Sequence, residues 1–212
     1  EGFQREMDSQ RTRSREATKN AFSAQQTVAE GFLPDRHSEF VGYETLQADT
    51  RAVAWREGQN DTVEVFLERT PFYSESGGQI GDRGCIRNDE AELEVEDTVR
   101  IGEGIVHRGR LVRGTADGLT SGQVTATVDA ERRLDTARNH TATHLVHMAL
   151  RRVLGSHVDQ AGSMVAPDRM RFDFTHFTGV TAEQLEEIEA IANGVVLQDL
   201  AVDISLIPLD KA

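Results

Sequence analysis

The sequence predicts an α+β fold with an N-terminal helix, a small β-barrel-like unit, and an α+β core built on a long histidine-bearing helix. Between residues 39 and 129, short runs of branched and aromatic residues alternate with glycine-containing turns, as is typical of small barrels and sandwiches. From residue 130 the pattern changes to helical periodicity, followed by two strand-like runs and a further helix. We therefore expect three parts, at residues 1–30, 31–129 and 130–212.

Residues 1–30 are predicted to form a polar helix with few apolar positions. Arginines and acidic residues are interleaved along it, and such a helix rarely folds alone. Two interpretations stay open: a solvated surface helix, or a connecting helix that touches an RNA backbone. Gly31 ends the helical pattern, and residues 34–38 are expected to form a linker.

The second part contains a series of strand patterns. They are rich in branched or aromatic residues, or alternate between apolar and polar positions, and they lie at residues 51–55, 62–67, 91–96, 104–107 and 123–128. Turn signals occur at residues 58–61 and 115–118. The pattern does not distinguish a barrel from a sandwich, because short strands joined by glycine turns build both.

The third part begins with a long helix over residues 130–154, which Gly155 is expected to end. Two strands, at residues 162–165 and 170–174, are predicted around a turn at Pro167 and Asp168. A last strand is expected from Val202 to Ile207.

Thr181 and Gln184 fit a capping box, which predicts that a helix begins after Thr181. Spacing at helical intervals then predicts the apolar stripe of this helix, formed by Leu185, Ile188, Ala192 and Val195.

The composition limits the class of protein. Cys85 is the only cysteine, so no internal disulfide is possible and a reducing cytoplasm is the expected location. The formal net charge is -13, which opposes long-range attraction to nucleic acid but leaves a local arginine patch open. No apolar run approaches the roughly 18 residues of a membrane span. Without an initiator methionine or leader-like stretch, the chain is expected to be a piece of a longer protein.

His140 and His144 are the first candidate site. They lie four residues apart on the predicted helix, and therefore share one face. On a helical wheel they fall opposite the predicted core stripe, together with His147 and Arg151. Zinc accepts two imidazoles so placed, although satisfied core histidines or an idle exposed face stay possible. Thr141 occupies the position where a zinc peptidase would carry its glutamate base, which disfavours that chemistry.

A glycine-rich segment at residues 70–84 is the second candidate site. Exposed amides in such a loop can hold an anion or a substrate carbonyl. The segment is neither a phosphate-binding P-loop nor a dinucleotide fingerprint, because no Gly-Lys-Ser/Thr and no helical pattern follow it. An ordinary hairpin loop is the alternative, and composition alone does not decide between the two.

Four stretches together resemble the alanyl-tRNA synthetase family. TPFYSESGGQIGD at residues 70–82 is similar to the glycine-rich motif of its editing domain, and RNHTATHL at 138–145 to the first half of that domain's zinc site. HVDQAGS at 157–163 and RMRFDFTHF at 169–177 are similar to the stretches that follow. The resemblance covers essentially the whole chain, and residues 1–30 resemble the end of the tRNA-recognition region.

The resemblance implies a function for each part. The full enzyme joins alanine to its tRNA with ATP and magnesium, and its editing domain hydrolyses that tRNA when it carries serine or glycine. It also implies roles for seven residues. His140 and His144 would be zinc ligands. Gln160 and Thr141 would act at the editing pocket, and Gly77, Gly78 and Gln79 would lie near the substrate.

One departure from the family pattern matters. The resemblance implies two further zinc ligands from a Cys-x-x-x-His motif later in the chain, and the sequence ends at Ala212 without it. We therefore expect half a zinc site, with weak or absent metal binding. His157, His176 and Asp173 are candidate partners of the pair, although their spacing specifies nothing. A freestanding editing hydrolase and an RNA-binding module without catalysis are the alternative functions.

Overall fold

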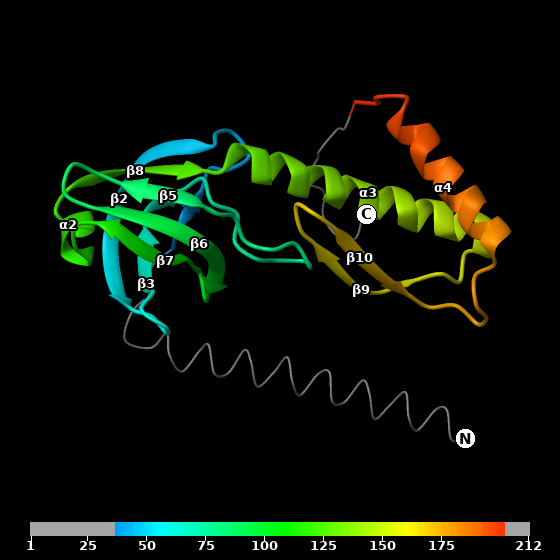
Figure 1. The fold of residues 1–212 in the computed structure, drawn as a ribbon, viewed down its shortest axis with the longest axis horizontal. Coiled ribbons are helices and arrows are strands. Elements are labelled where there is room, and N and C mark those ends of the chain that lie inside the picture. Colours follow the sequence, from blue (N-terminus) through cyan, green and yellow to red (C-terminus); the bar gives the residue numbers. More distant parts are fainter. Residues whose placement is uncertain (1–36, 202–212) are drawn as a thin grey trace, which may run out of the picture. The chain divides into compact units, whose positions relative to one another are not determined.

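The computed structural model describes residues 37–201. The helix predicted over residues 1–30 and the strand predicted from Val202 to Ile207 therefore lie outside the described residues. The chain divides into two compact units, Glu1–Leu134 and Asp135–Ala212. Mixed helices and strands confirm the predicted α+β class, and their order along the chain can be followed in Figure 1.

The first unit is a closed barrel, which decides between the two β architectures. Its strands are antiparallel and follow the order β2-β3-β7-β6-β5-β8 (Figure 1). They span Gln47–Glu57 (β2), Val63–Leu67 (β3), Gly84–Arg87 (β5), Glu92–Ile101 (β6), Gly104–Arg113 (β7) and Gln123–Val128 (β8). Closure gives each of these six strands a neighbour on both sides, which removes a common route to aggregation.

Alternating apolar residues of the strands fill the barrel. On β6, Leu93 and Val95 are buried while Glu94 between them is exposed, as the two-residue period of a strand requires. β3 is buried along its whole length. Outside the barrel, two short strands, β1 (Glu39–Phe40) and β4 (Arg69–Thr70), pair in parallel.

The turn predicted at residues 115–118 is wrong in type. The chain forms a short helix there, α2 (Ala116–Thr120), whose N-cap is Thr115. The Thr115 side chain accepts a hydrogen bond from the Gly118 amide, and the Trp55 indole donates to Asp117 at 2.9 Å. This contact from a strand 62 residues earlier stabilises a helix that local sequence alone does not predict.

The second unit contains most of α3 (Ala130–Leu154), a hairpin of β9 (Gln160–Val165) and β10 (Met170–Phe174), and α4 (Ala182–Val196). Gly155, with φ of 119°, follows the last residue of α3 as predicted. The capping box of Thr181 and Gln184 is present. Ala149 and Leu150 of α3 form the core with Val158 and Ile188, so that the hairpin and α4 pack against the same helix.

The predicted apolar stripe of α4 is partly wrong. Ile188 is buried at 6% exposure, whereas Leu185 is 54% exposed. Ile191 packs against the core instead, because the contact line runs through Ile188 and the residue three positions later, which share one helix face. Among residues 37–201, no helix is both long and apolar enough to cross a bilayer.

Candidate functional site

His140 and His144 lie side by side on α3, as the spacing predicts. Their ring centres are 5.3 Å apart and the ring planes differ by 17°. A tetrahedral zinc ion with bonds of about 2.0–2.1 Å to one nitrogen of each ring would place the two centres about 5 Å apart. The distance between the two ring centres therefore matches that of two histidine ligands on one zinc ion, while the nearly parallel planes are those of stacked rings.

The protonation state of His140 also suits a ligand. His140 is half-buried and His144 is exposed. Burial, and then the neighbouring His144, lower the pKa of His140 below its ordinary value. A lowered pKa favours the neutral imidazole, which is the form that binds a metal.

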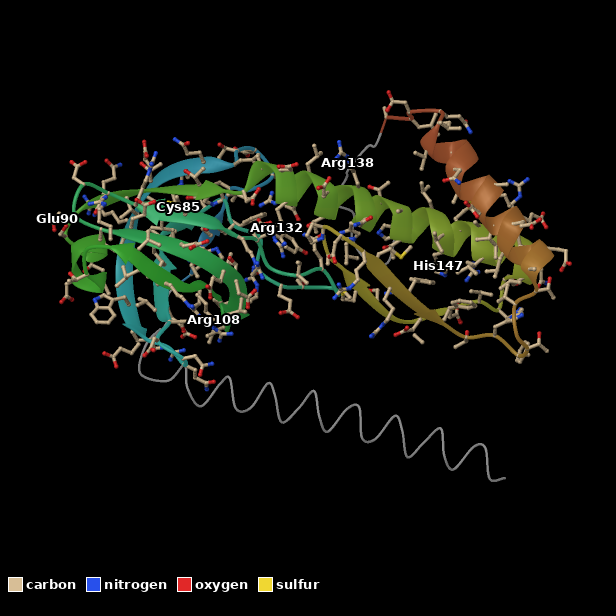
Figure 2. The ribbon with its side chains drawn as sticks, viewed as in Figure 1. Cys85, Glu90, Arg108, Arg132, Arg138 and His147 are labelled. Atoms are coloured by element: carbon tan, nitrogen blue, oxygen red, sulfur yellow. The ribbon has the colours of Figure 1, made fainter. Side chains whose placement is uncertain are left out.

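The helix face predicted to carry His140, His144, His147 and Arg151 is not accessible along its whole length. The ring of His147, which Figure 2 labels on α3, packs on Phe172 with centres 5.0 Å apart. Its Nε2 lies 3.4 Å from the Val158 carbonyl oxygen. Arg151 donates to the same oxygen at 3.0 Å. The prediction that this face lies opposite the core is therefore wrong beyond His144, because the chain entering β9 crosses it.

Thr141 and Gln160 are both exposed. Thr141 directly follows His140 on α3, and Gln160 is the first residue of β9. The Gln160 amide lies 3.1 Å from the Ser163 hydroxyl. Both side chains can therefore exchange hydrogen bonds with a bound molecule, because neither is locked inside the core.

Sequence reasoning missed Asn139, which precedes His140. Its side-chain amide donates to the Ala166 carbonyl at 2.7 Å and to the Pro167 carbonyl at 3.1 Å. The hairpin turn is thereby attached to α3 next to the histidine pair. An amide donor before an apolar helical stripe is too common a signal to identify this role from sequence.

The other predicted metal partners do not join the pair. His157 Nε2 lies 3.0 Å from His176 Nδ1, so these two histidines bond to each other. Asp173 pairs with Arg171 at 3.2 Å. Within the part of the chain described, residues 37–201, no group of three or more histidine, cysteine or acidic side chains is placed to hold a metal. The sole cysteine, Cys85, lies on the barrel, where burial and then Glu92 raise the pKa of its thiol.

The glycine-rich segment forms a tight turn at its centre. Ser76 and Gln79 exchange backbone hydrogen bonds of 3.1 and 2.9 Å across Gly77 and Gly78. Both glycines have positive φ, 60° and 85°, which defines a turn that glycine adopts without strain. The hairpin interpretation is thus correct for its local geometry. The backbone of the turn is also open to its surroundings, since a Cβ built on Gly77 would have no neighbour within 4 Å.

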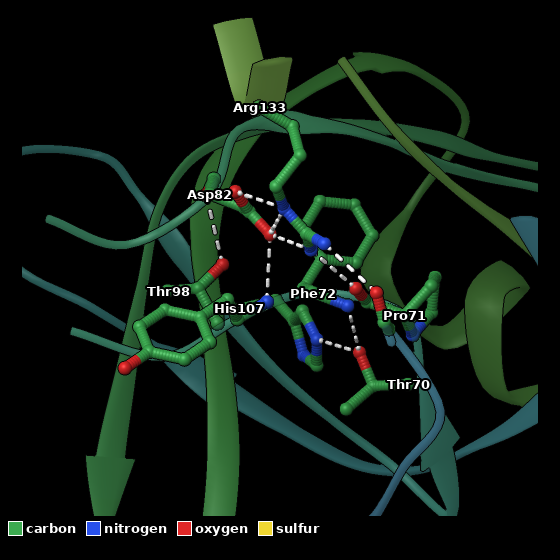
Figure 3. Close-up of polar contacts among 9 residues, drawn as sticks. Thr70, Pro71, Phe72, Asp82, Thr98, His107 and Arg133 are labelled. Atoms are coloured by element: carbon green, nitrogen blue, oxygen red, sulfur yellow. Dashed lines mark hydrogen bonds and ion pairs between the residues drawn. The ribbon is translucent and has the colours of Figure 1, made fainter. Parts of the chain in front are cut away.

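A buried ion pair holds the two ends of this segment together. Asp82, only 5% exposed, accepts from Arg133 Nε at 3.0 and 2.9 Å and from the Tyr73 amide at 2.7 Å (Figure 3). The same guanidinium donates to the Gly42 and Pro71 carbonyls at 2.9 and 2.8 Å. The sequence pattern singles out neither Asp82 nor Arg133. Their separation of 51 residues leaves no local signal.

His107 completes the buried support. It is fully buried, and burial lowers its pKa from 6.5 to about 4. Its Nε2 lies 2.7 Å from the Thr70 hydroxyl (Figure 3). Its Nδ1 lies 3.0 Å from the Val65 carbonyl oxygen. A carbonyl only accepts, so Nδ1 donates and Nε2 accepts. The hydroxyl in turn accepts from the Phe72 amide at 3.1 Å, so that both ring nitrogens of His107 and the Thr70 hydroxyl have partners.

Comparison with known proteins gives a consistent result. The family model of class II tRNA synthetases (A) matches residues 1–132. The chain is 44% identical over 222 residues to the alanine–tRNA ligase of Bacillus velezensis and 46% identical over 220 residues to that of Methylococcus capsulatus. The alanine–tRNA ligase of Bacillus subtilis is 43% identical over 224 residues. Each comparison covers 100% of this chain and 25% of the relative, so the chain spans about a quarter of the length of these curated relatives.

Proposed function

Because this chain belongs to the family of class II tRNA synthetases (A), we propose that it forms part of an enzyme that joins alanine to its tRNA with ATP and magnesium. We further propose that this part performs editing, which is the hydrolysis of that tRNA when it carries serine or glycine. The observation that carries the proposal is the histidine pair on α3, in a chain similar along its whole length to alanine–tRNA ligases.

The chemistry of the substrates explains why editing is needed. A pocket shaped for alanine cannot strongly exclude serine, which adds one hydroxyl, and discrimination in such cases reaches only about 100-fold. Glycine is smaller still and enters freely. A second site that forms a hydrogen bond with the hydroxyl selects serine. Alanine binds this site poorly, because it leaves the site's polar groups unpaired.

Each candidate residue then has a role. Gln160 and Thr141, both exposed, would donate to or accept from the serine hydroxyl. His140 and His144 would hold a zinc ion together with ligands outside the described residues. When bound, zinc supplies Lewis acidity toward water or the ester carbonyl. The glycine turn at Gly77, Gly78 and Gln79 would let the substrate approach the backbone closely.

The experiment compares Gln160→Ala with Gln123→Ala in the full-length enzyme. Gln123 is an exposed glutamine of the barrel and serves as the matched control. We expect Gln160→Ala to slow the hydrolysis of serine-charged tRNA by at least about tenfold, since one hydrogen bond to the hydroxyl is lost. Glycine-charged tRNA has no side-chain hydroxyl, so its hydrolysis should slow less.

Attachment of alanine should be unchanged in both variants. Equal hydrolysis of serine-charged tRNA by Gln160→Ala, Gln123→Ala and the unaltered enzyme would contradict the assigned role of Gln160. No hydrolysis by the unaltered enzyme, with tRNA binding retained, would favour an RNA-binding module without catalysis.

A further inference from the structure

A small cavity opens on the barrel unit beside the glycine turn. Its volume is about 220 Å³, below the roughly 300 Å³ at which pockets for drug-sized ligands begin. It suits a single flat ring system. Three aromatic rings, two serines and an arginine line it: Phe40, Tyr43, Tyr73, Ser74, Ser76 and Arg100.

The aromatic rings beside the cavity meet edge to face instead of stacking on one another. Phe40 meets Tyr43 edge to face, with centres 5.0 Å apart and planes at 83°, and it meets Tyr73 at 6.0 Å and 73°. Tyr43 is 84% exposed. A large aromatic ring at this exposure is unfavourable in water unless something covers it, and flat ring faces bind other flat rings well.

Arg100 supplies positive charge at the same place. It is exposed on β6 and makes no side-chain hydrogen bond or ion pair with any of residues 37–201. Arg69, Arg110 and Arg133 of the same unit each pair with a carboxylate, that of Glu39, Glu96 and Asp82 respectively. An uncommitted guanidinium beside aromatic rings matches a phosphate joined to a base.

The cavity walls are held in place before any ligand binds. The Tyr73 amide donates to Asp82, and the Val41 amide donates to the Thr70 carbonyl at 2.9 Å, next to Phe40. Gly42, between Phe40 and Tyr43, lies so close to its neighbours that a Cβ would be 2.3 Å from the Pro71 carbonyl oxygen. A rigid receptor loses little entropy on binding.

We propose that this cavity binds an unpaired nucleotide of the tRNA, with its base on the faces of Tyr43 and Tyr73 and its phosphate on Arg100. Stacking on aromatic side chains and arginine is how proteins hold single-stranded RNA. We assign the cavity to the unpaired nucleotides at the 3′ end of the tRNA. Ser76 lines the cavity and also begins the glycine turn, which the proposed function places beside that end. The inference rests on the proposed function, because only that function identifies the bound RNA as tRNA.

The test measures binding of uncharged tRNA by the full-length enzyme. Two tRNAs are compared, one complete and one lacking its unpaired 3′ nucleotides. Tyr43→Ala should weaken binding of the complete tRNA by about tenfold and leave binding of the shortened tRNA unchanged. Tyr43→Phe keeps the ring and should bind like the unaltered enzyme.

Arg100→Gln tests the phosphate contact against a matched control. It should weaken binding and reduce the slope of affinity against salt by about one unit. Arg87→Gln removes the same charge from an exposed arginine of β5 that does not line the cavity, and should change neither quantity.

Unchanged binding in both Tyr43→Ala and Arg100→Gln overturns the inference, as does an equal loss for the complete and shortened tRNAs. A protein segment covering the cavity would also overturn it, and would appear as unchanged tRNA affinity with altered stability in Tyr43→Ala. Failure of the proposed function is distinguishable, because uncharged tRNA can bind without any ester to hydrolyse.

Discussion

Several charged or titratable side chains are buried in the barrel unit, whereas most candidate site residues of the α3 unit are exposed. In the barrel, Glu64, Asp82 and His107 are no more than 6%, 5% and 0% exposed, and each has several hydrogen-bonding partners. On the α3 unit, the candidate residues His144 and Gln160 are exposed. Buried polar groups with full sets of partners fix a structure, whereas exposed ones remain available to bind.

This difference predicts where a substitution acts. Removing a partner from a buried, satisfied group leaves the other partner desolvated, which costs far more than the net value of the bond. An exposed group returns to water when its partner is lost. Substitutions in the barrel network should therefore reduce stability, and those on the α3 face should reduce function with the fold intact.

The largest effect is expected for Asp82→Asn. It leaves the Arg133 guanidinium, whose side chain is 17% exposed, without its counter-charge. Breaking such a pair from one side costs about 3 kcal/mol or more. Urea unfolding followed by Trp55 fluorescence measures it, because Trp55 is the only tryptophan and lies on β2 of the barrel.

Glu39→Gln is the matched control for that measurement. It removes a carboxylate from an ion pair with Arg69 in the same unit, whose side chains are 61% and 52% exposed. Surface pairs are worth about 0.5 kcal/mol or less. Equal effects of Glu39→Gln and Asp82→Asn would break the distinction between buried and exposed groups.

A second, pH-dependent effect should come from His107. Its pKa is about 4 in the folded barrel against 6.5 for the ordinary group, so between these values the unfolded state binds more protons. Its stabilising contribution is therefore complete above pH 6.5 and is lost as the pH falls toward 4, by about 3 kcal/mol in total. Urea unfolding at several pH values across this window measures the loss.

His107→Asn removes the titrating group and should flatten this pH dependence. The variant will be less stable than the unaltered chain at pH 7, because Thr70 loses a partner, so the comparison concerns the slope and not the absolute stability. An unchanged slope in His107→Asn would show that other groups are responsible.

The same contrast explains what the sequence could predict. The barrel strands follow from local alternation, as Leu93 and Val95 show on β6, and the end of α3 follows from Gly155. The type of turn at Thr115 and the exposure of Leu185 depend on contacts from distant segments. Local pattern does not contain that information.

For the candidate site, the histidine pair was predictable because four residues return a helix to the same face. The Asp82–Arg133 pair was not, since 51 residues separate its members and either side chain alone is typical of a surface. The crossing of His147 by the chain before β9 was equally hidden, because only the packed hairpin creates it.

The smallest effect on stability is expected for His144→Ala, which tests the exposed side chains of the α3 unit. His144 is exposed, and its ring lies beside His140. Loss of the side chain should change the free energy of unfolding by about 0.5 kcal/mol or less, measured by the thermal loss of helical circular dichroism. Zinc added to this 212-residue chain should raise the melting temperature little, because two histidines make half of a four-ligand site. A large, stoichiometric stabilisation by zinc that His144→Ala abolishes would show that the site is complete without further ligands.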